Sequence, residues 1–176
     1  MTSTSCNRGT WESAKNTLRP LIDRDAIYDA LPDRLPEREP DRETVFYLIR
    51  EFIRMLRLLP VGAGRGEYVT MVVGVRMMRD HLVTLLMQDV RNLDPGGMLH
   101  QSKLLNPEQM RMLERLPYPG PERQALIDAN LAIAREFMPR ARAMAERLGI
   151  AWPQAFEEAT RPRLAETLGE TIGNGC

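Results

Sequence analysis

The spacing of apolar residues between positions 41 and 93 constrains the fold more than any other feature of this sequence. From Asp41 to Leu59 these residues recur every three or four positions, as along one face of an α-helix. From Glu67 to Leu93 the run is apolar around much of the helical circumference, which predicts the central and most buried helix. No segment shows a convincing strand alternation. The chain is therefore predicted to be all-α, a bundle of about five or six helices with a long central helix.

Capping residues and prolines predict where the first helices begin and end. Asp41 is a good N-cap for the first helix, which Pro60 and the glycines after it are expected to end. Asn106 and Pro107 begin a short third helix, because asparagine caps well and proline is favoured at the first helical position. The prolines within residues 32–40 exclude a long helix there and predict an extended linker.

Two further helices are predicted in the C-terminal part of the chain. The longer one runs from about Glu122 to Leu148 with Gly149 as its C-cap, and Pro139 is expected to kink or split it. The last helix covers about residues 154–168, where Pro162 is expected to end or bend it.

The length of 176 residues fits one domain with loose ends. Residues 1–17 are expected to form a flexible N-terminal segment and residues 171–176 a frayed tail. Residues 18–170 are predicted to be a single helical domain. Within it, the Asp23-Arg24-Asp25 sequence is expected to form a turn and a helix cap.

Charge and cysteine content exclude several classes of function. Basic and acidic residues number 24 each, so nothing in the composition favours a nucleic-acid partner. Cys6 and Cys176 stand near the two ends without a Cys/His cluster, so no metal, no cofactor and no disulfide scaffold are predicted, and a cytoplasmic location is expected. No signal-peptide pattern and no run of eighteen apolar residues occurs, so no membrane partner is expected.

Four segments carry a resemblance to a known family. Residues 65–89, RGEYVTMVVGVRMMRDHLVTLLMQD, open with Arg-Gly-Glu-aromatic and continue as an apolar helix with a central basic residue. Residues 100–116 combine a loop with a short helix, and residues 129–153 form a helix that leaves through an aromatic-proline pair. With residues 21–31, these segments resemble in order and spacing the C-terminal helical domain of lincosamide and aminoglycoside nucleotidyltransferases.

The resemblance covers most of residues 18–170 and implies a helical domain that helps to bind an acceptor antibiotic. It does not extend to the catalytic half of those enzymes, which carries a Gly-Ser phosphate-binding turn and two metal-binding aspartates. This chain has no Gly-Ser dipeptide, and no strand precedes Asp23-Arg24-Asp25. We therefore expect no nucleotidyl transfer by this chain alone. Its expected partner is a small organic molecule, which it could bind beside a separate catalytic chain.

One stripe of the helix from Glu67 is the predicted binding site. Small, polar or soft residues recur along it at three-and-four spacing. Together with the nearby Arg76 they form the predicted ligand-binding set: Glu67, Thr70, Gly74, Arg76, Met77 and Thr84. His81 lies on the same stripe and is the candidate catalytic residue, because an imidazole readily exchanges a proton near neutral pH. A solvent-facing helix edge and a structural histidine are the alternatives.

Three functions are compatible with these patterns. The first is a small-molecule-binding domain derived from a nucleotidyltransferase. The second is a stand-alone enzyme of secondary metabolism, a cyclase or isomerase that uses His81 for acid–base chemistry. The third is a homodimeric interaction module, since the YVTMVVGVRMM stretch at residues 68–78 is wide enough to serve both core and interface. A closed cavity containing His81 would favour the first two, and an exposed apolar patch the third.

Overall fold

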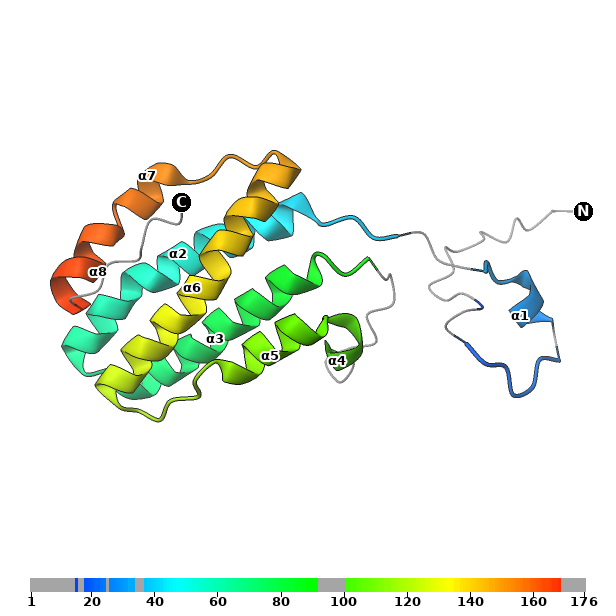
Figure 1. Ribbon diagram of the computed structural model, residues 1–176, viewed down its shortest axis with the longest axis horizontal. Coiled ribbons are helices and arrows are strands. Elements are labelled where there is room, and N and C mark those ends of the chain that lie inside the picture. The colour runs from blue at the N-terminus through cyan, green and yellow to red at the C-terminus, as the bar shows by residue number, and fades with distance from the viewer. Residues whose placement is uncertain (1–14, 16–17, 25, 34–36, 92–100, 169–176) are drawn as a thin grey trace, which may run out of the picture.

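Three long helices form the core of the computed structural model (Figure 1). They are α2 (Arg42–Arg65), α3 (Tyr68–Met87) and α6 (Arg123–Leu148), and each packs against the other two. Phe52 of α2 stacks on Phe137 of α6 with ring centroids 3.8 Å apart. The structure describes these residues: 15, 18–24, 26–33, 37–91 and 101–168. They form helices and no strand, which confirms the predicted all-α bundle with a long central helix.

The most buried helix is α6 rather than α3. Twelve side chains of α6 are buried, against six in α3. On α3, Val69, Val73 and Met77 are 75%, 56% and 42% exposed. The prediction that the helix from Glu67 is the most buried one is therefore wrong. The alanines of α6 let the other two helices approach closely, whereas the apolar circumference of α3 exceeds what its neighbours cover.

Helix α2 begins at the predicted residue and ends at the last of the predicted glycines, Gly66, but Pro60 does not end it. The Asp41 side chain accepts hydrogen bonds from the backbone N–H groups of Glu43 and Thr44, which confirms the cap. The helix continues through Pro60 and ends at Gly66, which has a φ of 73°. Pro60 is buried among apolar neighbours, and burial of that face offsets the backbone hydrogen bond that the proline removes.

The capping chemistry of α5 (Pro107–Arg115) and of α6 was predicted correctly. Asn106 accepts from the backbone N–H of Gln109, whose side chain accepts in turn from the Asn106 N–H. Gly149 ends α6 with a φ of 63°, a conformation that glycine adopts without strain. Pro139 lies inside α6 without ending it.

Short helices complete the described chain. A single turn, α4 (Gln101–Leu104), precedes α5. The last predicted helix is divided into α7 (Gln154–Glu158) and α8 (Arg161–Leu168), a break that falls just before Pro162, as expected. Helix α8 packs against α2 and α7. Figure 1 shows α7 and α8 as a strap at one end of the bundle.

An N-terminal arm, residues 18–24 and 26–33, stands apart from the bundle and contains α1 (Ile27–Ala30) (Figure 1). The Asp23 carboxylate accepts from the backbone N–H groups of Ile27 and Tyr28 at 2.9 and 2.8 Å. A cap by Asp25 was predicted; in the structure Asp23, three residues before the N-cap position Ala26, accepts these bonds at the start of the helix. Asp25, the loop with His100, the segment 1–14 and the tail 171–176 lie outside the described residues.

Candidate functional site

A groove of about 330 Å³ opens between α2 and α3, and we call it the α2–α3 groove. Its floor includes Asn130 of α6, whose side-chain amide donates to the Leu126 carbonyl at 2.7 Å. Four methionines line it, Met55 from α2 and Met71, Met77 and Met78 from α3. Its partly exposed apolar wall consists of Leu58, Val61, Val73 and Met77, which are 48%, 37%, 56% and 42% exposed.

Two glycines shape this groove in different ways. A Cβ atom on Gly62 of α2 would lie 3.0 Å from Cγ of Met71, so this glycine lets α3 approach α2 closely. A Cβ atom on Gly74 of α3 would meet no atom within 4 Å. Gly74 therefore removes material from the wall, and the space that a side chain would fill belongs to the groove.

The predicted ligand-binding residues divide between two cavities. Glu67, Thr70, Gly74 and Met77 line the α2–α3 groove, as one helical stripe should. Two others, Arg76 and Thr84, line a separate cavity of about 500 Å³ between α3 and α5. The structure therefore does not bring all six residues together in one cavity.

Arg79 of α3 holds α5, the other wall of the second cavity, in position. Its guanidinium donates to the carbonyl oxygens of Leu113, Leu116 and Pro117 at 2.9–3.0 Å. The same group lies 3.8 Å from the centre of the Tyr118 ring. These contacts cap the C-terminal end of α5 and hold it against α3, which occupies the donors that an anionic ligand would need.

His81 lines neither of these two cavities. Its Nδ1 atom lies 2.6 Å from the carbonyl oxygen of Met77, and its ring stacks with that of Tyr47 at a centroid distance of 6.4 Å. Within the described part of the chain its Nε2 atom is buried and has no hydrogen-bond partner. The structure therefore places His81 between α2 and α3, beyond the end of the groove.

The charged rim of the groove comes mostly from α2. Arg54 donates from Nε to Oε2 of Glu51 at 2.8 Å. This hydrogen bond, with the charges of Arg54 and His81, outweighs desolvation and lowers the pKa of Glu51 below its ordinary value. Arg65 and Glu67 stand at the other end. The rim therefore carries two arginines against a single glutamate among the residues that line the groove.

Sequence reasoning missed the contribution of α2 to this site. Leu58 and Val61 follow the apolar spacing of α2 loosely, and in a sequence they look like two more core residues. The structure turns them outward beside Val73 and Met77. The signal that could have identified them is the width of the apolar stripe, since one buried face does not hold every apolar residue of α2.

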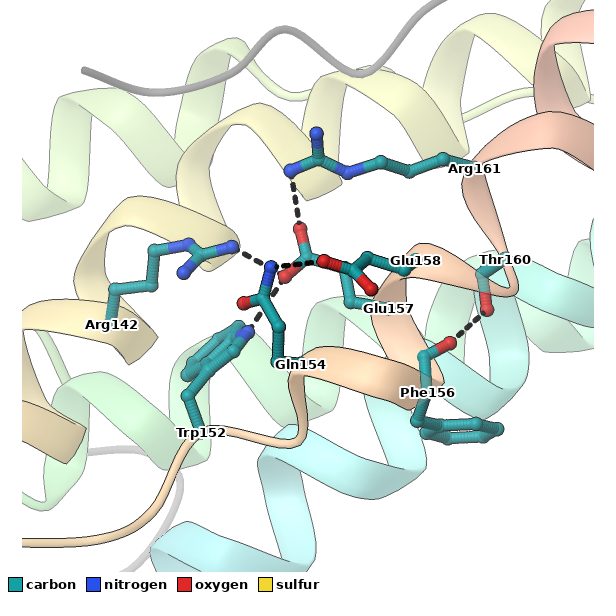
Figure 2. A network of polar contacts seen from close by, with 8 residues as sticks. All are labelled: Arg142, Trp152, Gln154, Phe156, Glu157, Glu158, Thr160 and Arg161. Atoms are coloured by element: carbon teal, nitrogen blue, oxygen red, sulfur yellow. Dashed lines mark hydrogen bonds and ion pairs between the residues drawn. The ribbon is translucent and has the colours of Figure 1, made fainter.

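A second polar cluster, the Glu157 cluster, lies between α6, α7 and α8 and consists of Arg142, Trp152, Glu157 and Arg161 (Figure 2). Glu157 accepts from Nε1 of Trp152 at 2.7 Å, from Arg161 at 2.8 Å and from Arg142. The Arg142 guanidinium also lies over the Trp152 ring, 4.4 Å from its centre. The cluster joins three elements around one carboxylate.

Electrostatics keep Glu157 ionised although its side chain is only 7% exposed. Burial by itself raises the pKa of this carboxyl. The hydrogen bonds from Arg161 and Trp152, with the charge and hydrogen bond of Arg142, outweigh burial and hold the pKa below its ordinary value. No ligand is needed to satisfy this carboxylate, so the cluster is an anchor for α7 and α8 rather than a binding site.

Two classes of site find no support in the residues that the structure describes. No group of three His, Cys, Asp or Glu side chains is arranged to hold a metal ion there. None of the helices in the described ranges has the length and apolar content needed to cross a membrane.

Comparisons with protein-family models, with curated proteins and with solved structures find no match for this chain.

Proposed function

We propose that this chain is a helical interaction module whose α2–α3 groove binds an apolar segment of a protein partner. One observation carries the proposal: four neighbouring apolar side chains remain exposed around an open groove, although the same helices bury a large core. They are Leu58, Val61, Val73 and Met77. Scattered exposed apolar residues are ordinary, but a contiguous set beside a groove is typical of an interaction site.

The chemistry of the groove suits a peptide segment. Two neighbouring helices, with open space at Gly74 in the wall of the groove, offer the geometry in which an amphipathic helix places its apolar face. Methionine side chains are flexible and polarisable, so Met71 and Met77 can adapt to apolar groups of different shape. Arg54 and Arg65 at the rim favour a partner with acidic residues beside its apolar ones.

A photo-crosslinking amino acid at position 73 tests this proposal in cells that make the protein. We expect adducts with a polypeptide, because Val73 is exposed beside the groove. Gly74→Leu should abolish them by filling the groove. Gly64→Leu is the matched control, because Gly64 also lies in a helix with open space around it and does not line the groove. Adducts that survive Gly74→Leu would contradict the proposal.

A small organic molecule is the second candidate occupant. The groove volume of about 330 Å³ falls within the range of ligand pockets, and Glu67, Thr70, Gly74 and Met77 line it. This function would match the resemblance to the acceptor-binding half of antibiotic nucleotidyltransferases, with any catalysis supplied by a separate chain. Calorimetry with ATP and Mg²⁺ should then show no micromolar binding to this chain alone, since its sequence lacks the Gly-Ser dipeptide of the phosphate-binding turn in those enzymes.

A further inference from the structure

We propose that the occupant of the α2–α3 groove is the N-terminal arm of a second copy of this chain, so that two copies exchange arms. The inference rests on the proposed function and names the partner. Two surfaces of one chain, the groove and the arm, expose apolar side chains that no other described part covers. The exposed apolar side chains of the arm could be buried in the groove, and those of the groove could be buried by the arm.

The arm carries an uncovered apolar cluster within a short stretch. Leu18, Leu21, Ile22 and Ile27 are 47%, 94%, 77% and 51% exposed. Burial of these side chains against an apolar surface would stabilise a complex, before the costs of association. A segment that served only as a linker would not need four exposed apolar side chains.

The arm is internally organised, so it can present these side chains as a preformed element. The Lys15 N–H donates to the Pro32 carbonyl at 2.9 Å, and the Tyr28 hydroxyl donates to the Lys15 carbonyl at 3.4 Å. Asp23 caps the single turn of α1. A segment that is already folded loses less conformational entropy on docking than a disordered one.

Local charges are compatible with the same pairing. Counted with Lys15, the described residues of the arm carry three aspartates, two arginines and one lysine, so the arm has no net charge, and Lys15 pairs with Asp33. In the groove Arg54 pairs with Glu51, and Arg65 at the rim is the basic side chain that Asp29, close to the exposed Ile27, can meet.

Contacts at the base of the arm fix the point at which it leaves its own bundle. The Arg38 N–H donates to the Arg91 carbonyl at 2.9 Å, and Arg91 pairs with Glu37 at 2.7 Å. These contacts fix the base of the arm at the C-terminal end of α3. Gly74 in the groove lies 13 residues before the last residue of α3, about 20 Å away along the helix.

The arm is also directed away from its own bundle (Figure 1). A reciprocal exchange between two copies gives a closed two-fold dimer in which each groove is filled once. Both exposed apolar surfaces are then buried by one and the same contact.

Sedimentation equilibrium of the full chain tests the inference. We expect a reversible dimer, with the dissociation constant raised about tenfold or more by the double change L21E/I22E in the arm, and likewise by Gly74→Leu in the groove. Gly64→Leu should leave it unchanged. Because the arm stands apart from the bundle, the melting temperature of a dilute, monomeric sample should not fall in the arm variant.

Mixing the two deficient variants provides the decisive experiment. L21E/I22E keeps an intact groove and Gly74→Leu keeps an intact arm, so the mixture should form heterodimers that neither variant forms with itself. A dimer built by direct contact of two α2–α3 faces would not recover in this way, and that result would overturn the inference.

Two other outcomes would also overturn it. One is a wild-type chain that stays monomeric at high micromolar concentration, and the other is a dimer that the arm variant leaves intact. Adducts from position 73 with a different protein, sensitive to Gly74→Leu, would then show that the interaction module survives with another partner. If the chain neither dimerises through its arm nor gives adducts that Gly74→Leu removes, the proposed function fails as well.

Discussion

The Glu157 cluster and the α2–α3 groove are both built where helices meet, and both contain arginines, but they end in opposite states. In the cluster, one carboxylate that is 7% exposed accepts from two guanidinium groups and an indole. In the groove, apolar side chains remain 37–56% exposed, and Arg54 is occupied at the rim by Glu51. In the Glu157 cluster the polar groups satisfy one another, whereas the α2–α3 groove still exposes apolar surface that a partner could bury. The first therefore contributes to stability, and the second is available for binding.

The largest expected effect contrasts the two sides of α3. Val75→Asp places an unpartnered charge in the core, where Val75 is 5% exposed, and should cost about 3–5 kcal/mol and largely unfold the chain. Val73→Asp, on the groove side, should change stability by only about 0.5 kcal/mol. Thermal denaturation followed by circular dichroism compares the two. Equal melting temperatures would mean that both faces of α3 are equally exposed.

Next in size is the removal of the carboxylate at the centre of the Glu157 cluster. Glu157→Ala removes the carboxylate that accepts from Arg142, Arg161 and the Trp152 N–H, and should cost about 2–3 kcal/mol. Glu158→Ala is the matched control, because Glu158 is exposed and bonds only to Gln154 among the contacts shown in Figure 2. Urea denaturation gives both free energies of unfolding, and equal values would show that the cluster does not anchor α7 and α8.

A smaller effect is the dependence of this anchor on pH. Because the pKa of Glu157 is lowered in the folded chain, its contribution should be complete above about pH 4.5, the ordinary value, and be lost as the pH falls through the lower folded value. The difference in unfolding free energy between the wild type and Glu157→Gln should therefore shrink on acidification. A difference that grows as the pH falls would mean that the folded pKa is raised instead.

The smallest expected effect concerns His81, which lies beyond the end of the groove. His81→Ala removes the contact to the Met77 carbonyl and the stacking with Tyr47, and should cost about 1 kcal/mol. Crosslinking from position 73 should not change. If the variant kept its stability but lost ligand binding or turnover, while His81→Gln retained part of the binding, the catalytic interpretation of His81 would return.

Local chemistry made much of the fold predictable from sequence. Asp41, Asn106 and Gly149 end or begin helices through contacts within a few residues, so their roles can be recognised without knowing the tertiary structure. Pro60 could not be judged in this way. Whether a proline ends a helix depends on how much stabilisation the face around it gains by burial. That is decided by the helices packed on α2, of which α6 and α8 are far away in the sequence.

The candidate site was predictable only on one of its two walls. The stripe of Glu67, Thr70, Gly74 and Met77 follows from helical geometry, but the sequence does not state on which side of α3 the neighbour α2 lies. For this reason Arg76, which lines the cavity between α3 and α5, was grouped with residues that line the α2–α3 groove. The Glu157 cluster was missed altogether, because its ion pair with Arg142 joins residues 15 positions apart on separate helices.

Pro60 has a further consequence for motion within the groove. A proline has no N–H, so the backbone ladder of α2 lacks the hydrogen bond that would reach the Leu56 carbonyl, and two glycines follow in the next turn. Val61, Gly62 and Arg65, which line one end of the groove, therefore belong to a segment that can unwind without disturbing the turns before it. In hydrogen-exchange experiments, amides after Pro60 should open by local fluctuation, while those around Phe52 should require global unfolding. The mouth of the groove is thus its softest part, able to widen for a bulky side chain at little expense to the core.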